Sequence, residues 1–202
     1  MATPKHKIGI VVGSLRRDSI NRKVANSIAA FTQEWLDCEI VEIGDLPLYN
    51  QDEDAAPTPA VTAFRDKIRA MDGVLFVTPE YNRSVPGVLK NALDVGSRPY
   101  GQSVWDKKHA AIVTASPGGI GAFGANHHLR QSLVFLNMPA MQQPEAYLGR
   151  VNDDSFGANG ELKDGPLKDL VVNVAHAFAD WVDLIIRGRQ LLAEDAAHSS
   201  KG

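Results

Sequence analysis

Hydroxyl, amide and guanidinium side chains gather in residues 14–22, directly after the apolar, largely β-branched run of residues 8–12. Apolar residues then recur with helical spacing from Asn21 to about Trp35, so this turn joins a buried strand to a helix. Backbone N–H groups and the positive end of the helix dipole meet at such a turn, where an anion binds well. The turn lacks the lysine and spacing of a nucleoside triphosphatase loop, so the predicted anion is a cofactor's own phosphate.

The turn offers two kinds of phosphate ligand. Hydroxyl and amide groups donate single hydrogen bonds, and a guanidinium adds charge and a bidentate fork. The candidates are Ser14, Ser19, Asn21, Arg16, Arg17 and Arg22. The structural alternative is a capped helix with solvated arginines, in which Ser19 or Asn21 is the N-cap.

A second chemically unusual segment, residues 78–87, follows the apolar run of residues 73–78. Pro79 and Pro86 restrict its backbone, and Tyr81 stands beside Asn82. An aromatic surface next to rigid amide donors suits a planar heterocycle. The alternative is a plain turn before a helix, built by Pro79, Asn82 and Ser84.

A third segment, residues 116–124, is rich in glycine and follows the apolar run of residues 109–115. Glycines let a backbone approach a ligand closely, although they also suit a flexible turn that caps the next helix. Gly119 to Gly124 matches the GxGxxG pattern of dinucleotide-binding proteins. That match begins too late in the chain for the six-stranded sheet of that fold, so it stays a minor alternative.

The elements that must position these segments alternate along the chain. Apolar runs predict strands, and 3.6-residue periodicity predicts helices, with Ser84 as the N-cap of the third. The predicted strands are residues 8–12, 39–43, 73–78, 109–115 and 140–146; the predicted helices are residues 21–35, 61–71, 85–96, 122–136 and 168–187. This alternation predicts a doubly wound α/β fold with a flavodoxin-like five-stranded parallel sheet of order 2-1-3-4-5 and helices on both faces. The three segments then meet at the carboxyl ends of the strands, where such sheets bind ligands.

Length, charge and composition limit the number of domains, the classes of partner and the cellular compartment. The 202 residues suit a single domain, which we expect to span residues 1–188, with a frayed tail over residues 189–202. The net charge of −3 gives no basic field for nucleic acid or an anionic membrane. We find no signal peptide and no apolar run of membrane-spanning length. The lone Cys38 suits a reducing compartment, so we expect a cytoplasmic protein.

Residues 13–21, 47–50 and 78–94, together with the loop at Ser116, resemble the NADPH-dependent FMN reductase family, most nearly its bacterial quinone and chromate reductases. The resemblance implies an FMN whose ring borders the second and third segments and whose phosphate lies in the first. It implies contacts from Ser14, Arg16, Ser19, Asn21 and Arg22 to the phosphate, from Pro79, Glu80, Tyr81 and Asn82 to the isoalloxazine, and from Ser116 and Gly119 to the flavin.

The chemistry implied by the resemblance is hydride transfer from NADPH or NADH to FMN, then electron transfer to quinone-like, chromate or azo acceptors. No side chain is arranged as a nucleophile or general base, so we assign none as catalytic. The adjacent His127 and His128 point about 100° apart on a helix, which argues against a metal site. The resemblance further implies a homodimer or homotetramer, although Arg83 and His127 depart from the aromatic residues often found there. A flavodoxin-type electron carrier or flavin-binding regulatory module is the alternative.

Overall fold

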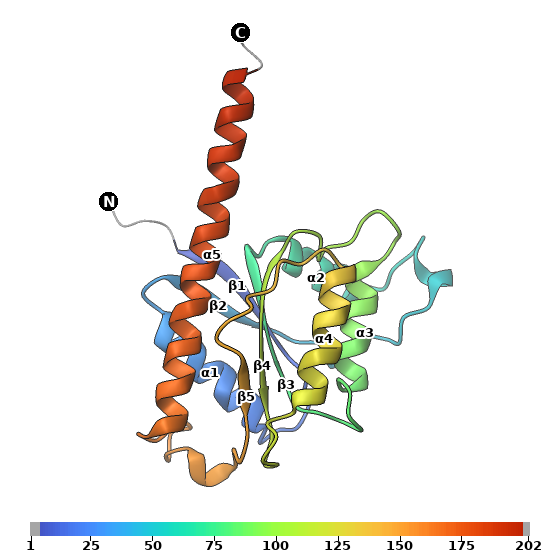
Figure 1. Cartoon of the computed structure of the whole chain (residues 1–202). Coiled ribbons are helices and arrows are strands. Elements are labelled where there is room, and N and C mark those ends of the chain that lie inside the picture. The colour runs from blue at the N-terminus through green and yellow to red at the C-terminus, as the bar shows by residue number, and fades with distance from the viewer. Residues whose placement is uncertain (1–4, 200–202) are drawn as a thin grey trace.

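A five-stranded parallel sheet forms the centre of the protein, as a computed structural model that describes residues 5–199 shows (Figure 1). The strands are β1 (His6–Val12), β2 (Leu36–Val41), β3 (Gly73–Thr78), β4 (His109–Ala115) and β5 (Ala146–Leu148). Their order in the sheet is β2-β1-β3-β4-β5, and every neighbouring pair is parallel. The predicted flavodoxin-like fold is confirmed.

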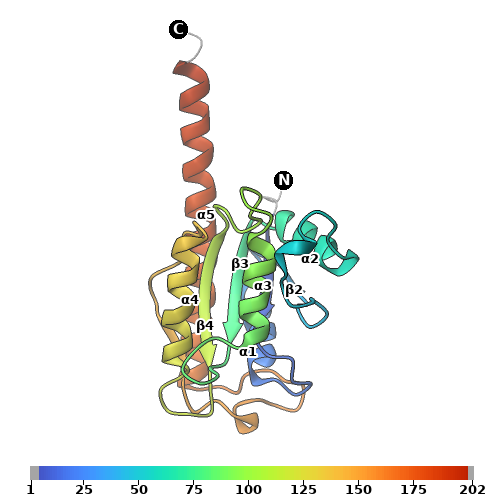
Figure 2. The same ribbon diagram turned by 90° about the vertical axis from the view of Figure 1, so that its right-hand side faces the viewer.

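Helices cover both faces of this sheet (Figures 1 and 2). They are α1 (Ile20–Thr32), α2 (Pro59–Arg69), α3 (Gly87–Ser97), α4 (Phe123–Phe135) and α5 (Pro166–Ser199), with short 3₁₀ turns at Gln51–Glu53 and Asp153–Ser155. One apolar core joins α1 and α5 to the sheet, through side chains such as Ile28 and Phe178. A second core on the other face joins α2, α3 and α4, through side chains such as Phe64, Leu89 and Leu129.

The last strand departs from the prediction. We expected it at residues 140–146, but β5 begins at Ala146 and only an isolated bridge joins Ala140 to Ala110. Pro144 interrupts the predicted segment, and proline has no N–H to donate to a strand ladder. The pairing of β5 with β4 therefore starts two residues after the proline. The loop that follows β5 begins later in the sequence than predicted for the same reason.

Two helix ends also differ from the prediction. Ser84 does not cap α3; Pro86 stands at the N-cap position, and the Ser84 hydroxyl lies 2.9 Å from Nδ1 of His128. The expected frayed tail from residue 189 is helical as far as Ser199, where the description of the chain ends. Glutamine, leucine, alanine and glutamate, all good helix formers, dominate that stretch and explain the longer helix.

The ends of β1 and β3 approach each other closely at Gly13. Its N–H donates to the carbonyl of Val77 at 2.9 Å, and a Cβ on this residue would lie 2.1 Å from Oγ1 of Thr78. Only glycine fits such an approach without displacing the neighbouring strand. The loops after β1 and β3 therefore start side by side, at the point where the strand order reverses.

Candidate functional site

A pocket of about 250 Å³ lies at the carboxyl ends of the strands. Its walls come from the loops after β1, β3, β4 and β5, and eight of the eleven predicted site residues line it. These eight are Ser14, Arg16, Ser19, Asn21, Pro79, Glu80, Tyr81 and Ser116. The other three, Arg22, Asn82 and Gly119, lie outside its lining, and Arg22 and Asn82 have structural roles that are given below.

The first loop presents two buried hydroxyls to the pocket. Ser19 is the N-cap of α1, and its Oγ accepts a hydrogen bond from the backbone N–H of Arg22 at 3.3 Å. The Oγ of Ser14 accepts one from the N–H of Arg16 at 3.4 Å. Because both oxygens act as acceptors toward the backbone, their hydroxyl protons are left to donate to an anion. Helix capping and phosphate binding are therefore compatible at Ser19.

Asn21 carries an unsatisfied polar atom in this wall. Its Nδ2 donates to the carbonyl of Ala115 at 3.3 Å, which links the first loop to the end of β4. Its Oδ1 is buried and has no hydrogen-bond partner. Leaving such an acceptor unpaired costs about 1–3 kcal/mol, so it calls for a ligand that brings a hydroxyl or N–H donor.

Arg22 is engaged away from the pocket. Its guanidinium donates two hydrogen bonds to Glu42, at 2.8 and 2.7 Å. This hydrogen bonding raises the pKa of Arg22 and lowers the pKa of the Glu42 carboxyl. The arginine that lines the pocket is Arg16, whose side chain is exposed. The phosphate role predicted for Arg22 is therefore better suited to Arg16.

The second loop turns back at Asn82 and Arg83. Both residues have positive φ, 51° and 64°, and Tyr81 and Ser84 exchange two backbone hydrogen bonds around them at 2.9 and 3.0 Å. This is the geometry of a type I′ turn, in which asparagine is favoured because it tolerates the left-handed conformation. Asn82 therefore shapes the turn, while Tyr81 forms the pocket wall.

Glu80 connects the second loop to the third. Its Oε2 accepts a hydrogen bond from the N–H of Ala125 at 3.1 Å, and its Oε1 lies 3.4 Å from a guanidinium nitrogen of Arg83. The N-cap residue of α4, Ala122, provides no side-chain cap, so Glu80 supplies the negative charge that a helix N-terminus favours. A Cβ at Gly124 would lie 2.9 Å from Oε2, so the glycine gives this carboxylate its room.

The glycines of the third loop pack against the end of β5. A Cβ at Gly121 would lie 2.4 Å from the carbonyl carbon of Tyr147, and one at Gly149 would lie 2.5 Å from the carbonyl oxygen of Gly119. Ser116 lines the pocket, and its Oγ accepts from the N–H of Gly118 at 3.1 Å. Close packing between loops thus explains Gly121 and Gly149, whereas a Cβ at Gly119 would meet only Nε of Arg150, at 3.9 Å. The contact of Gly119 with a ligand stays a prediction.

Asn152 and Asp153, in the loop after β5, line the pocket although the sequence did not point to them. The rule about strand ends would have found them, but the predicted last strand ended too early. Asp153 forms an ion pair with Lys23 at 2.8 Å, and the hydrogen bond from this lysine lowers the pKa of the carboxyl. The nearby cation offsets the repulsion between Asp153 and a bound anion.

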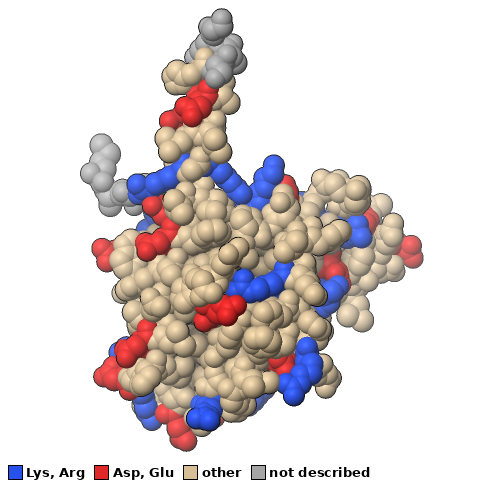
Figure 3. All heavy atoms as spheres, viewed as in Figure 1, with Lys and Arg blue, Asp and Glu red and all other residues tan. Residues whose placement is uncertain are grey.

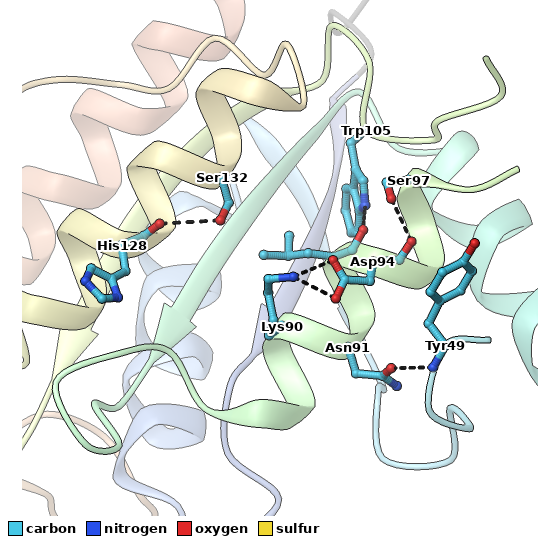
Figure 4. A network of polar contacts seen from close by, with 9 residues as sticks. Tyr49, Lys90, Asn91, Asp94, Ser97, Trp105, His128 and Ser132 are labelled. Carbon is cyan, nitrogen blue, oxygen red and sulfur yellow. Dashed lines mark hydrogen bonds and ion pairs between the residues drawn. The ribbon is translucent and has the colours of Figure 1, made fainter. Parts of the chain in front are cut away.

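The segment 47–50, part of the sequence pattern above, is fixed to α3. Asn91 accepts a hydrogen bond from the N–H of Tyr49 at 2.8 Å and donates one to the carbonyl of Pro47 at 2.8 Å. Figure 4 shows Asn91 directed at Tyr49, beside the Lys90–Asp94 ion pair on the same helix. A separate pocket of about 350 Å³ opens beside this segment, and it shares no lining residue with the first.

The two adjacent histidines have different partners. Nε2 of His127 lies 3.1 Å from the Tyr147 hydroxyl, whereas His128 contacts Ser84. Within residues 5–199, no three His, Cys, Asp or Glu side chains are grouped to hold a metal ion. Over the same residues, no helix has the length and apolar character that crossing a membrane requires.

Residues 6–153 match the model of the family described as NADPH-dependent FMN reductase. This chain belongs to that family. A quinone reductase of Pseudomonas putida is 57% identical over 180 residues, which cover 89% of this chain and 96% of that protein. A 2-hydroxy-1,4-benzoquinone reductase of a Burkholderia species is 44% identical, over 87% of this chain and 96% of that protein.

A solved structure supports the same assignment. The flavoenzyme NAD(P)H:(acceptor) oxidoreductase FerB of Paracoccus denitrificans superposes with a TM-score of 0.84 at 38% identity, over 88% of this chain and 97% of that one. An NAD(P)H-dependent FMN reductase of Pseudomonas aeruginosa is 40% identical, over 85% of this chain and 92% of that protein. The protein is thus an oxidoreductase of a flavin-reducing family, which agrees with a pocket suited to a phosphate-bearing ligand.

Proposed function

We propose that this protein binds FMN in the pocket at the carboxyl ends of the strands and transfers electrons from NADPH or NADH to quinones. The observation that carries the proposal is the meeting, in one pocket, of the Ser14 and Ser19 hydroxyls, whose oxygens accept from backbone N–H groups, and the unpaired Oδ1 of Asn21. The serine hydroxyls can donate hydrogen bonds to a phosphate, and the ribityl hydroxyls of FMN can donate to Oδ1 of Asn21. Quinones are the substrates named for the Pseudomonas putida and Burkholderia relatives.

In this proposal each loop has a separate task. Ser14, Ser19 and the N-terminus of α1 hold the phosphate, with Arg16 adding charge at the rim. Tyr81 and Pro79 border the ring, and their loop is held in place by Glu80 through α4. Ser116 closes the opposite side of the pocket.

The bound FMN would supply the redox chemistry, and the protein supplies position and electrostatics. We assign no catalytic side chain. The pocket is smaller than the ~300–1,000 Å³ usual for small-molecule sites, so the ligand is only partly enclosed. An open face would admit the nicotinamide first and the acceptor second, in a ping-pong scheme, and it would also accommodate chromate or azo compounds.

We further propose a homodimer or homotetramer in the cytoplasm. Val134 and Phe135, at the end of α4, are 80% and 87% exposed, and apolar side chains so exposed on one helix favour contact with another subunit. Cys38 is a free thiol, as suits a reducing compartment. Residues 1–188 remain our prediction for the FMN-binding domain.

Steady-state kinetics test this function. NADPH and NADH should each be offered with a panel of benzoquinones, chromate, an azo dye and free FMN. We expect kcat/KM to be highest for a quinone and the initial-rate lines to be parallel, as in a ping-pong scheme. Flavin reduction without turnover of any acceptor would instead support the electron-carrier alternative, against which family membership already argues.

A further inference from the structure

The C-terminal end of α5 projects beyond the rest of the molecule (Figure 1). The guanidinium of Arg189 donates to the carbonyl of Lys107 at 2.8 Å, close to where the helix leaves the sheet. Every residue from Arg189 to His198 is exposed. A helical stretch this short is only marginally stable in water without tertiary contacts, so it calls for a partner.

The projecting end carries an apolar stripe. Leu184, Leu191 and Leu192 are 65%, 62% and 71% exposed. At about 100° per residue, Leu184 and Leu191 lie almost in line and Leu192 lies beside them. Gly188 lies within the same stripe, and nothing approaches the position where its Cβ would be. A second helix could therefore come close along this side.

Charges along the projecting end separate by sign. Arg187 and Arg189 lie where the helix leaves the globule, and Glu194 and Asp195 follow nearer its end. Nε of Arg187 lies 2.7 Å from Oδ2 of Asp183, and the arginine side chain is still 68% exposed, so its other guanidinium nitrogens are open to a second carboxylate. Figure 3 shows basic atoms at the base of the projection and acidic atoms further out. Arg187 and Glu194 are seven residues apart, so both lie on the same edge of the leucine stripe.

We propose that the α5 ends of two copies of this chain pair antiparallel, about a two-fold axis near Gln190 and Leu191. In that arrangement Arg187 of each copy faces Glu194 of the other, and the leucines meet at the centre. A parallel pair would place like charges opposite each other, which disfavours it. The antiparallel pair is self-complementary and closed, as a two-fold interface must be.

Other occupants suit this surface less well. An anionic membrane would be repelled by Glu194 and Asp195. The match to the family model ends at residue 153, before α5 begins, so the projecting helix end is not part of the pattern that this family model describes.

A charge-exchange series tests the pairing. The molar mass of full-length protein should be measured by analytical ultracentrifugation, as a function of concentration, for Arg187→Glu, Glu194→Arg and the double variant. We expect each single variant to weaken this association about tenfold, because like charges then face each other across the axis. The double variant should restore it. Equal masses for all four proteins, or a double variant weaker than either single one, would overturn the proposal.

Disulfide trapping tests the direction of the pair independently. In a Cys38→Ser background, Leu191→Cys should give a cross-linked dimer on oxidation, because residue 191 lies near the axis. His198→Cys should give none, because its two copies lie at opposite ends of an antiparallel pair. Cross-linking of the His198→Cys variant, with or without cross-linking at Leu191→Cys, would contradict the arrangement, because a parallel pair brings both positions together. NADPH-dependent reductase activity serves as the folding control, since the projection lies at the far edge from the pocket.

Discussion

The two edges of the sheet differ in how they treat polar groups. At the carboxyl edge, loops from four strands converge, side chains such as Glu80 and Asn21 link one loop to the next, and Oδ1 of Asn21 is left without a hydrogen-bond partner. At the opposite edge His109 is buried with Nδ1 unpaired, and α5 departs toward solvent. Unsatisfied groups in a pocket indicate a ligand, whereas the same feature in a closed core only makes stability depend on pH.

The largest effect expected at the carboxyl edge comes from Ser19→Asp. Aspartate caps a helix as well as serine does, so α1 should still form. A carboxylate about 4 Å from a phosphate costs about 4 kcal/mol per unit charge at an effective dielectric of 20, so we expect FMN affinity to fall at least ~100-fold. Fluorescence titration of apoprotein with FMN measures this.

The matched control is Thr58→Asp, which makes the same kind of change at the N-cap of α2, outside the pocket. Its FMN affinity should stay within about twofold of the wild type. Equal affinities for the Ser19 and Thr58 variants would place the phosphate elsewhere.

At the opposite edge, His109 should make stability depend on pH. Burial lowers its pKa from 6.5 to about 4, so the folded protein holds this ring neutral. Above pH 6.5 this histidine leaves the free energy of unfolding unchanged. As the pH falls from 6.5 toward 4, the free energy of unfolding decreases, by about 3 kcal/mol at most, because the unfolded chain binds a proton that the folded protein does not. Denaturant unfolding between pH 4 and 8 should show a steeper loss for the wild type than for His109→Gln. Parallel curves for the two proteins would remove His109 as the cause.

Arg16, in the loop after β1, and Arg22, in α1, should differ in how much they contribute to FMN binding. We expect Arg16→Gln to weaken FMN binding about tenfold, since a hydrogen bond to a charged group contributes about 1.5–3 kcal/mol. Arg22→Gln should change it less than twofold, because its guanidinium is held by Glu42. Isothermal titration with FMN compares them directly. A larger loss for Arg22→Gln would restore the role that the sequence suggested.

A smaller effect is expected at Glu80. Glu80→Gln keeps the shape of the side chain but removes the charge at the N-terminus of α4, which contributes about 0.3–1 kcal/mol. We expect FMN affinity to fall by a few fold with little change in the midpoint of thermal unfolding. A drop in thermal stability with unaltered FMN binding would mean that the contact serves the fold alone.

The sequence predicted the sheet order and most of the pocket because periodicity and loop chemistry are local signals. β3 and β4 match their predicted bounds since each is an uninterrupted apolar run. Partners distant in sequence could not be anticipated: Glu42 for Arg22, Ala125 for Glu80, and Tyr147 for the glycine loop. Asn152 and Asp153 were missed because Pro144 displaced the last strand.

The most direct test of the central claim is an anaerobic half-reaction. Purified protein reconstituted with FMN is mixed with NADPH or NADH while the visible absorbance of oxidised flavin is followed, and a quinone is then added. We expect the absorbance to bleach and the quinone to restore it, because the flavin carries the electrons between the two substrates. Failure to retain FMN, or bound FMN that neither nicotinamide bleaches, would contradict the account.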